Sequence, residues 1–189
     1  MFSPISNRAL KSNYNNLYQT KPSVSVLEDK IIAFAKQDSL PKNIIIIADA
    51  KSKSKKEKLK EHFPEAKILD PKEGNFLKES DLIEVIGEEP SEVPTWVFLE
   101  TESMELVSNV IPFLNARAKS HMITLFTTNK SNAYDNESVL NQHLSMLNLH
   151  YPSVNKETSN SKKARFEKIY KAKYGVPVSY THLTLPTKA

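Results

Sequence analysis

The sequence predicts an α/β protein with an open, mostly parallel sheet and helices on both faces of that sheet. Segments with the composition of strands alternate with amphipathic segments of helical period between residues 44 and 174. Such alternation is typical of right-handed βαβ crossovers. The first strand segment, Ile44-Ile45-Ile46-Ile47-Ala48-Asp49, is almost entirely apolar. A strand of this kind is expected where helices cover the sheet on both sides.

The other segments follow in a regular order. Further strands are predicted at residues 66–70, 95–100 and 121–127, with a short fifth strand around Leu149 and Tyr151. Helices are predicted from Ser54 to the residue before Pro64, and over residues 79–86, 103–118, 138–147 and 161–174. The first of these helices opens on Ser54-Lys55-Lys56-Glu57, the pattern of a capping box. Pro112 is expected to kink or break the third helix.

The two ends of the chain do not share this alternation. Residues 2–6 and 17–20 have the character of short strands, and residues 25–37 predict a helix. Because these strands are too few for a sheet of their own, residues 1–40 are interpreted as the tail of a preceding lobe and residues 41–177 as the main α/β lobe. Residues 178–189 have no helical period and are expected to be a non-native tail.

Composition and charge exclude several classes of protein. Hydrophobic residues make up 39% of the chain and charged residues 25%, as in ordinary globular domains. No apolar run approaches the roughly 18 to 20 residues that cross a bilayer, so no membrane span is expected. The net charge is +4, but no aromatic residues interleave with the lysines of residues 51–58. We therefore expect a solvated helix face there and no nucleic-acid partner.

The residue types needed for most catalytic sites are missing or badly spaced. The chain has no cysteine, and none of its three glycines belongs to a phosphate-binding loop. The five histidines lack the spacing of a metal site. Glu100 and Glu102, at the end of the third predicted strand, are not expected to form an acid/base pair. We expect no catalytic residue, no metal and no cofactor, and therefore no enzyme.

Polar residues gather where three predicted strands end. They are Asp49, the turn Glu100-Thr101-Glu102-Ser103, and the turn that contains Thr128 and Asn129. In open α/β sheets, ligands bind beyond the carboxyl ends of the strands. Hydroxyl, amide and carboxylate groups there would suit a small polar ligand. Helix capping is an equally good interpretation of any single one of these residues, Ser103 above all.

The segment Phe166-x-x-x-Tyr170-x-x-x-Tyr174-Gly175-x-Pro177 resembles one found in type I periplasmic binding proteins, the group of the branched-chain amino-acid receptors. The strands and serines of Phe2-Ser3-Pro4-Ile5-Ser6-Asn7 and of residues 16–23 are similar to parts of the first lobe of that family. The segments 125–130 and 149–155 resemble a branch found in envelope proteins with LysM peptidoglycan-binding modules. Together these similarities span residues 2–177.

The resemblance implies two lobes that close on a small ligand without chemistry. Ser3, Ser6 and Asn7 would face the cleft from the first lobe, and Asp49, Glu100, Thr101, Glu102, Ser103, Thr128 and Asn129 from the second. Residues 1–40 would then be a remnant of the first lobe with the interlobe crossover helix. The parent protein would lie in the periplasm or cell envelope, with peptidoglycan bound by a domain outside this chain.

Two departures from the family leave an alternative open. The turn after Asp49 is rich in lysine where amino-acid receptors place an aromatic-glycine pair, and residues 100–103 read Glu-Thr-Glu-Ser where the family often has glycines. A structural or protein-interaction module with a degenerate cleft is the alternative function. No signal peptide is visible at the N-terminus, so either the protein is cytoplasmic or its true beginning is missing.

Overall fold

The computed structural model describes residues 22–71, 75–136, 139–153 and 161–174. The chain divides into two units, Met1–Val154 and Asn155–Ala189. The predicted strands at residues 2–6 and 17–20, the site residues Ser3, Ser6 and Asn7, and the tail at 178–189 lie outside the described residues.

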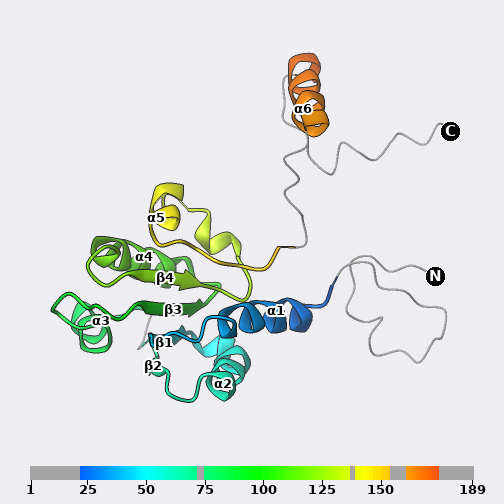
Figure 1. The fold of residues 1–189 in the computed structure, drawn as a ribbon. Helices are drawn as coiled ribbons and strands as arrows, with labels where there is room; N and C mark the ends of the chain where they lie inside the picture. Colours follow the sequence, from blue (N-terminus) through cyan, green and yellow to red (C-terminus); the bar gives the residue numbers. More distant parts are fainter. Residues whose placement is uncertain (1–21, 72–74, 137–138, 154–160, 175–189) are drawn as a thin grey trace, which may run out of the picture. The chain divides into compact units, whose positions relative to one another are not determined.

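The first unit is built on a four-stranded, all-parallel sheet (Figure 1). Its strands are β1 (Asn43–Ala48), β2 (Lys67–Leu69), β3 (Thr95–Glu100) and β4 (Ile123–Phe126), in the order β2-β1-β3-β4. The central pair is in register over six residues, from Asn43 opposite Thr95 to Ala48 opposite Glu100. The predicted fold class, an open parallel α/β sheet, is confirmed.

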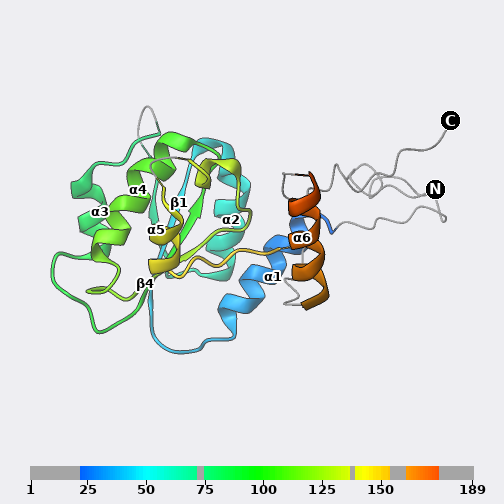
Figure 2. The same cartoon turned by 90° about the horizontal axis from the view of Figure 1, so that it is seen from above.

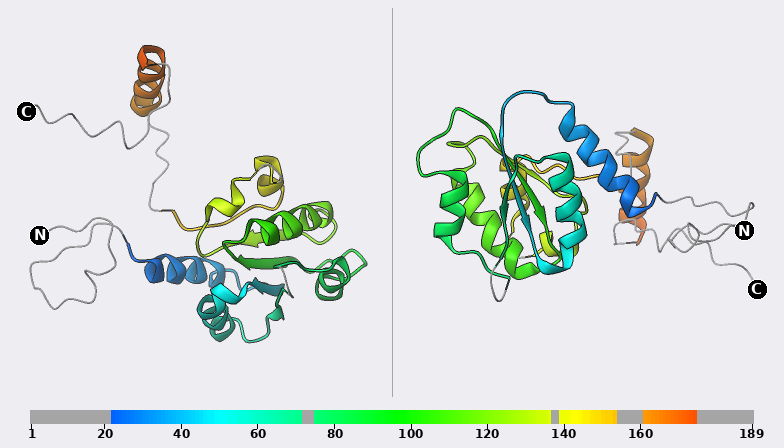
Figure 3. Two further views of the ribbon diagram at one scale, coloured as in Figure 1. Left: turned by 180° about the vertical axis from the view of Figure 1, so that it is seen from behind. Right: turned by 90° about the horizontal axis from the view of Figure 1, so that it is seen from below.

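Helices cover both faces of the sheet. They are α1 (Val24–Lys36), α2 (Lys53–His62), α3 (Glu79–Ile86), α4 (Met104–Arg117) and α5 (Asn141–Met146), with the 3₁₀ turns η2 (Ala50–Ser52) and η3 (Asn132–Tyr134). Figures 1 and 2 show α4 and α5 on one side of the strands and α1 and α2 on the other. The views in Figure 3, from behind and below, agree with this arrangement.

Alternate residues of the strands supply the two cores. Ile45, Ile47, Val97, Leu99 and Leu125 pack with buried residues of α3, α4 and α5. The intervening side chains pack with α1 and α2, and they include Ile46, Trp96, Phe98 and Phe126. This division follows from the alternation of side chains along a strand, and it explains the unbroken apolar runs at residues 44–48 of β1 and 96–99 of β3.

The helix that was predicted to start with a capping box at Ser54 starts differently, so that prediction is wrong. Ser54 lies inside α2, which begins at Lys53 and is preceded by η2. The side chain of Asp49 caps η2 by accepting a hydrogen bond from the N–H of Ser52. The buried end of β1 therefore sets the start of this helical segment, and the Ser54 hydroxyl does not.

Pro112 does not break α4, which runs through it from Met104 to Arg117. Ser103 caps this helix through its side chain, which accepts a hydrogen bond from Leu106 N–H. Buried residues lie on both sides of the proline, at positions 106, 107, 110, 111 and 114. Their burial holds the two halves of the helix on the sheet, although a proline removes one backbone hydrogen bond.

Three other elements complete the comparison with the sequence. The helix predicted at residues 138–147 is shorter, because Leu140 has an extended backbone and α5 begins at Asn141. The short fifth strand is a single bridge between Phe126 and His150. In the second unit, α6 (Ser161–Tyr174) has the predicted bounds, and the rings of Phe166 and Tyr170 lie 6.0 Å apart on it. Among the described residues, no helix is both long enough and apolar enough to cross a membrane.

Candidate functional site

Asp49, directly after β1, joins the ends of the two central strands. Its side chain is 4% exposed. One carboxylate oxygen accepts a hydrogen bond from Ser52 N–H at 2.9 Å, and the other accepts one from the Thr101 hydroxyl at 2.5 Å. Burial opposes ionisation, but the hydrogen bonds from Thr101 and Ser52 outweigh it and hold the pKa of Asp49 below its ordinary value. Asp49 is thus a negatively charged link between β1 and β3.

Glu100, the last residue of β3, is fully buried. Its carboxylate accepts hydrogen bonds from the backbone N–H of Thr128 at 2.5 Å and from the Thr128 hydroxyl at 2.6 Å. The ammonium group of Lys55, on α2, lies 3.5 Å away. Burial is the dominant influence and raises the pKa of Glu100 to about 7, against the opposing effects of Thr128 and Lys55.

Burial also affects Tyr134 of η3, which lies beside Glu100. Its hydroxyl donates a hydrogen bond to the backbone oxygen of Leu99 at 2.8 Å. Burial and the negative charge of Glu100 both raise the pKa of Tyr134. The phenol is therefore a neutral donor that fixes η3 to the end of β3.

A hollow of about 510 Å³ opens beside Asp49 at the carboxyl end of the sheet. The residues that line it are Asp49, Ala50, Lys51, Asn75, Glu102, Ser103, Met104 and Glu105. They come from the segments that follow β1, β2 and β3. The strand order reverses its direction of growth between β1 and β3, since β2 lies on one side of β1 and β3 on the other. The hollow thus lies at the topological switch point of the sheet.

The predicted site residues divide into two sets. Asp49, Glu102 and Ser103 line the hollow. Glu100, Thr101 and Thr128 are buried, and the hydrogen bonds described above join their side chains to other residues of the protein. Asn129 is exposed on the turn after β4 and is not among the residues that line the hollow.

Ser103 has the role that helix capping predicts. Its hydroxyl oxygen caps α4, and the hydroxyl also donates a hydrogen bond to Glu105 at 2.5 Å. The backbone N–H of Ser103 donates to the Thr101 hydroxyl oxygen at 2.9 Å. The turn between β3 and α4 is therefore fixed before any ligand arrives.

Sequence reasoning missed five residues of the hollow: Ala50, Lys51, Asn75, Met104 and Glu105. Four of them lie within two residues of Asp49 or Ser103 in the chain. Asn75 follows β2, and the same rule about strand ends would have found it. It adopts a left-handed backbone with φ of 53°, a conformation that asparagine tolerates better than most residues.

Three of the five lysines of residues 51–58 form ion pairs with other elements, whereas Lys53 lies on the solvated helix face that was predicted. Lys56 pairs with Asp70 at 2.8 Å, and Lys58 pairs with Asp29 of α1 at 2.6 Å. Lys55 pairs with Glu100. Positive charge on this helix is thus largely directed toward the protein's own carboxylates.

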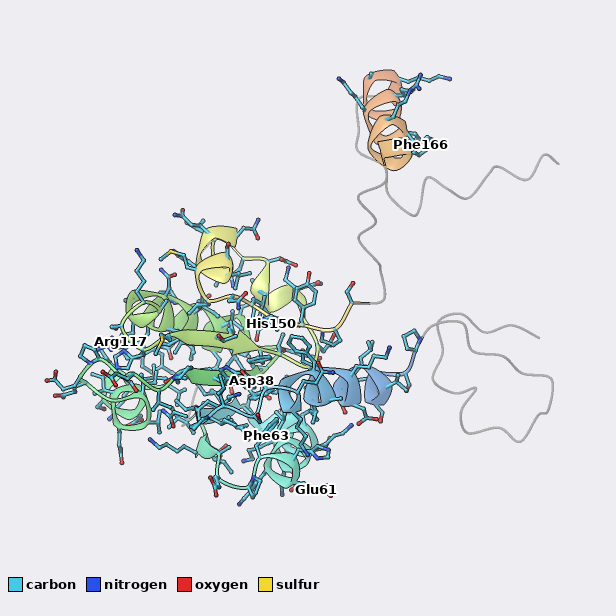
Figure 4. The ribbon with its side chains drawn as sticks, viewed as in Figure 1. Asp38, Glu61, Phe63, Arg117, His150 and Phe166 are labelled. Atoms are coloured by element: carbon cyan, nitrogen blue, oxygen red, sulfur yellow. The ribbon has the colours of Figure 1, made fainter. Side chains whose placement is uncertain are left out.

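A second concave region lies between α1 and the β4 side of the sheet, and it is lined by aromatic rings. Two adjoining hollows there, of about 310 and 420 Å³, share Phe34 and His150. The His150 ring lies 5.2 Å from that of Phe34 and is stacked 5.1 Å from that of Phe126. His150 is labelled in Figure 4. Burial lowers the pKa of His150. The sequence did not predict this region, because its aromatic residues are scattered along the chain.

Comparison of the chain with protein-family models, curated proteins and solved structures gives no match. Within the described parts of the chain, no cluster of three histidine, aspartate or glutamate side chains could hold a metal ion.

Proposed function

We propose that this chain is a non-catalytic binding module for a small polar ligand, which would occupy the hollow beside Asp49. The observation that carries the proposal is the position of that hollow at the switch point of a parallel sheet. Ligands of open α/β domains bind in that position, because the segments after the strands diverge there to opposite faces.

The chemistry of the lining supports a polar ligand. Lys51 offers a cation, Glu102 a carboxylate and Asn75 an amide, so that both donors and acceptors are available. Asp49 and Ser103 are already held by hydrogen bonds within the protein. A rigid floor with adaptable side chains at the rim suits binding, because little ordering is required when the ligand enters.

The wider context of the proposal comes from the family resemblance. It assigns the parent protein to the periplasm or cell envelope, with a first lobe closing over this one and with peptidoglycan bound by a domain outside this chain. Ser3, Ser6 and Asn7 would complete the site from that first lobe.

A second function, a structural or protein-interaction module, is favoured by a different observation. Glu100, Thr101 and Thr128 direct their side chains to other residues of the protein. Fewer polar groups are therefore available to a ligand than the sequence analysis predicted. The ring of Phe34 is 48% exposed beside an aromatic hollow. Exposed aromatic rings are common in protein interfaces.

Thermal unfolding with added ligands tests the first function against the second. The panel contains amino acids, amides and muropeptide fragments. A true ligand at a hundredfold excess over its Kd should stabilise the protein by about 2.7 kcal/mol, or roughly 5 to 10 °C in Tm. If no compound of the panel raises the Tm, the binding function is contradicted and the interaction module is favoured.

Matched variants locate the effect. The double substitution Lys51→Ala with Glu102→Gln removes one cation and one carboxylate from the lining of the hollow and should abolish the rise in Tm. Lys60→Ala, an exposed lysine on α2, serves as the control and should keep it. An equal loss in both variants would show that the ligand binds somewhere else.

A further inference from the structure

Glu100 is a buried carboxyl group at which three elements meet. It ends β3, it contacts Thr128 in the turn after β4, and it pairs with Lys55 of α2. The Glu100 side chain is 0% exposed, whereas that of Lys55 is 19% exposed. The Lys55 ammonium group can therefore reach solvent by rotation of its own side chain, whereas the Glu100 carboxyl group cannot.

The contacts of Glu100 complement a negative charge. One carboxylate oxygen accepts the Thr128 N–H, and the other accepts the Thr128 hydroxyl and lies 3.5 Å from the Lys55 ammonium. Tyr134 of η3 faces the same region as a neutral phenol. Asp49, after β1, is linked to Glu100 through its backbone N–H, which donates to the Glu100 backbone oxygen at 3.3 Å.

Two opposing influences act on this group. Removal from water favours the neutral acid, and the partners that donate to the carboxylate favour the charged form. The balance places the pKa of Glu100 at about 7, above the ordinary 4.5. Both forms are then populated near neutral pH, and only the charged form attracts Lys55.

We propose that Glu100 is a proton-operated latch on α2. The ionised carboxylate holds Lys55 and Thr128 together at the end of β3. When the carboxylate takes up a proton from solvent, the attraction to Lys55 is lost and the ammonium group turns outward to water. The latch concerns the attachment of α2 to the sheet, so it stands or falls independently of ligand binding in the hollow.

Direct titration tests the latch in the unmodified full-length chain. The ¹³C resonance of the Glu100 carboxyl, assigned with Glu100→Gln, should titrate with a midpoint near pH 7. The amide ¹H resonance of Thr128 should move with the same midpoint, because that N–H donates to the carboxylate. A midpoint near 4.5, or a Thr128 amide that does not follow Glu100, would overturn the proposal.

The part played by Lys55 is tested by substitution. Lys55→Ala removes the cation that stabilises the ionised form, so the Glu100 midpoint should rise above that of the unmodified protein. Lys60→Ala, an exposed lysine on the same helix, should leave the midpoint in place. If the Glu100 carboxyl titrates with the same midpoint in Lys55→Ala as in the unmodified protein, Lys55 is not part of the latch.

Equilibrium unfolding gives a third measurement. A carboxyl group whose pKa is raised in the folded protein stabilises it below pH 4.5, and this stabilisation is lost as the pH rises to 7. Between these values, the unfolding equilibrium constant should rise by roughly two orders of magnitude relative to that of Glu100→Gln. Glu61→Gln, an exposed carboxyl of α2 (Figure 4), is the control and should run parallel to the unmodified protein.

If the unfolding equilibrium constant of Glu100→Gln changed with pH in the same way as that of the unmodified protein, the proposed latch would be contradicted. If Glu100→Gln does not fold, the pH midpoint of the Thr128 amide in the unmodified protein, and its change in Lys55→Ala, still test the proposal.

Discussion

Two carboxyl groups at the ends of neighbouring strands respond to burial in opposite ways. Asp49 and Glu100 follow β1 and end β3, and the backbone of one donates to the backbone of the other. Hydrogen bonds from Ser52 and Thr101 outweigh burial at Asp49 and lower its pKa, whereas complete burial prevails at Glu100 and raises its pKa. The depth of burial, and not the number of donors, therefore separates the two groups.

The link between Asp49 and Thr101 leads to a prediction about stability. Thr101→Val removes the hydroxyl that donates to Asp49 and leaves a buried carboxylate oxygen without that partner. The free energy of unfolding, measured with urea, should fall by about 1–3 kcal/mol.

Thr95→Val, at the start of the strand that precedes Thr101, is the matched control. The Thr95 hydroxyl is buried and has no hydrogen-bond partner among the described residues. Its removal should leave stability unchanged or raise it, because an unsatisfied polar group is replaced by an apolar one. Equal losses in the two variants would show that the change of shape, and not the hydrogen bond, is responsible.

The helices are held by the faces that they bury, even where their local sequence opposes a helix. In α4, buried residues before and after Pro112 keep the helix continuous. The proline has a cost in backbone hydrogen bonding that packing offsets.

We expect Pro112→Ala to raise the free energy of unfolding by about 1–3 kcal/mol, because alanine restores the missing donor and suits a helix interior. Thermal or urea unfolding measures the change. Ala116→Gly, at an exposed position of the same helix, should lower stability by about 1 kcal/mol. A loss of stability in Pro112→Ala would show that the proline ring itself is needed for packing.

The sequence was sufficient to predict elements whose signal is local. The bounds of β3 and α3 agree with the prediction, because apolar patterning defines both of them. The start of α2 was predicted wrongly, since it depends on Asp49 and on the distant Thr101 that holds it. The gathering of polar residues at the strand ends was foreseen. Their mutual hydrogen bonds could not be, because the register of Ala48 with Glu100 decides which groups meet.

Across the first unit, the response to pH combines a buried group, Glu100, and a half-buried group, His150, of opposite effect. Glu100 stabilises the folded protein most at low pH. His150, whose pKa burial lowers below 6.5, does the reverse. The unfolded chain takes up a proton on His150 more readily than the folded protein, so its contribution is complete above pH 6.5 and is lost as the pH falls.

His150→Phe should keep the ring stack on Phe126 while removing the titrating group. The stability of the variant should then decline less between pH 6.5 and 5 than that of the unmodified protein. Urea unfolding at a series of pH values measures this difference, and ¹H resonances of the imidazole report the His150 midpoint. A midpoint at or above 6.5 would contradict the expectation.

The short edge strand β2 also bears on self-association. It offers only three residues of backbone at that edge of the sheet, and Lys67, its first residue, directs its ammonium group to the backbone oxygen of Val85 at 2.9 Å. A second chain that paired with β2 could form backbone hydrogen bonds with only three residues, one of which is the charged Lys67. A short, charged edge strand of this kind disfavours edge-to-edge pairing between copies of the chain. It helps the protein to remain dispersed at high concentration.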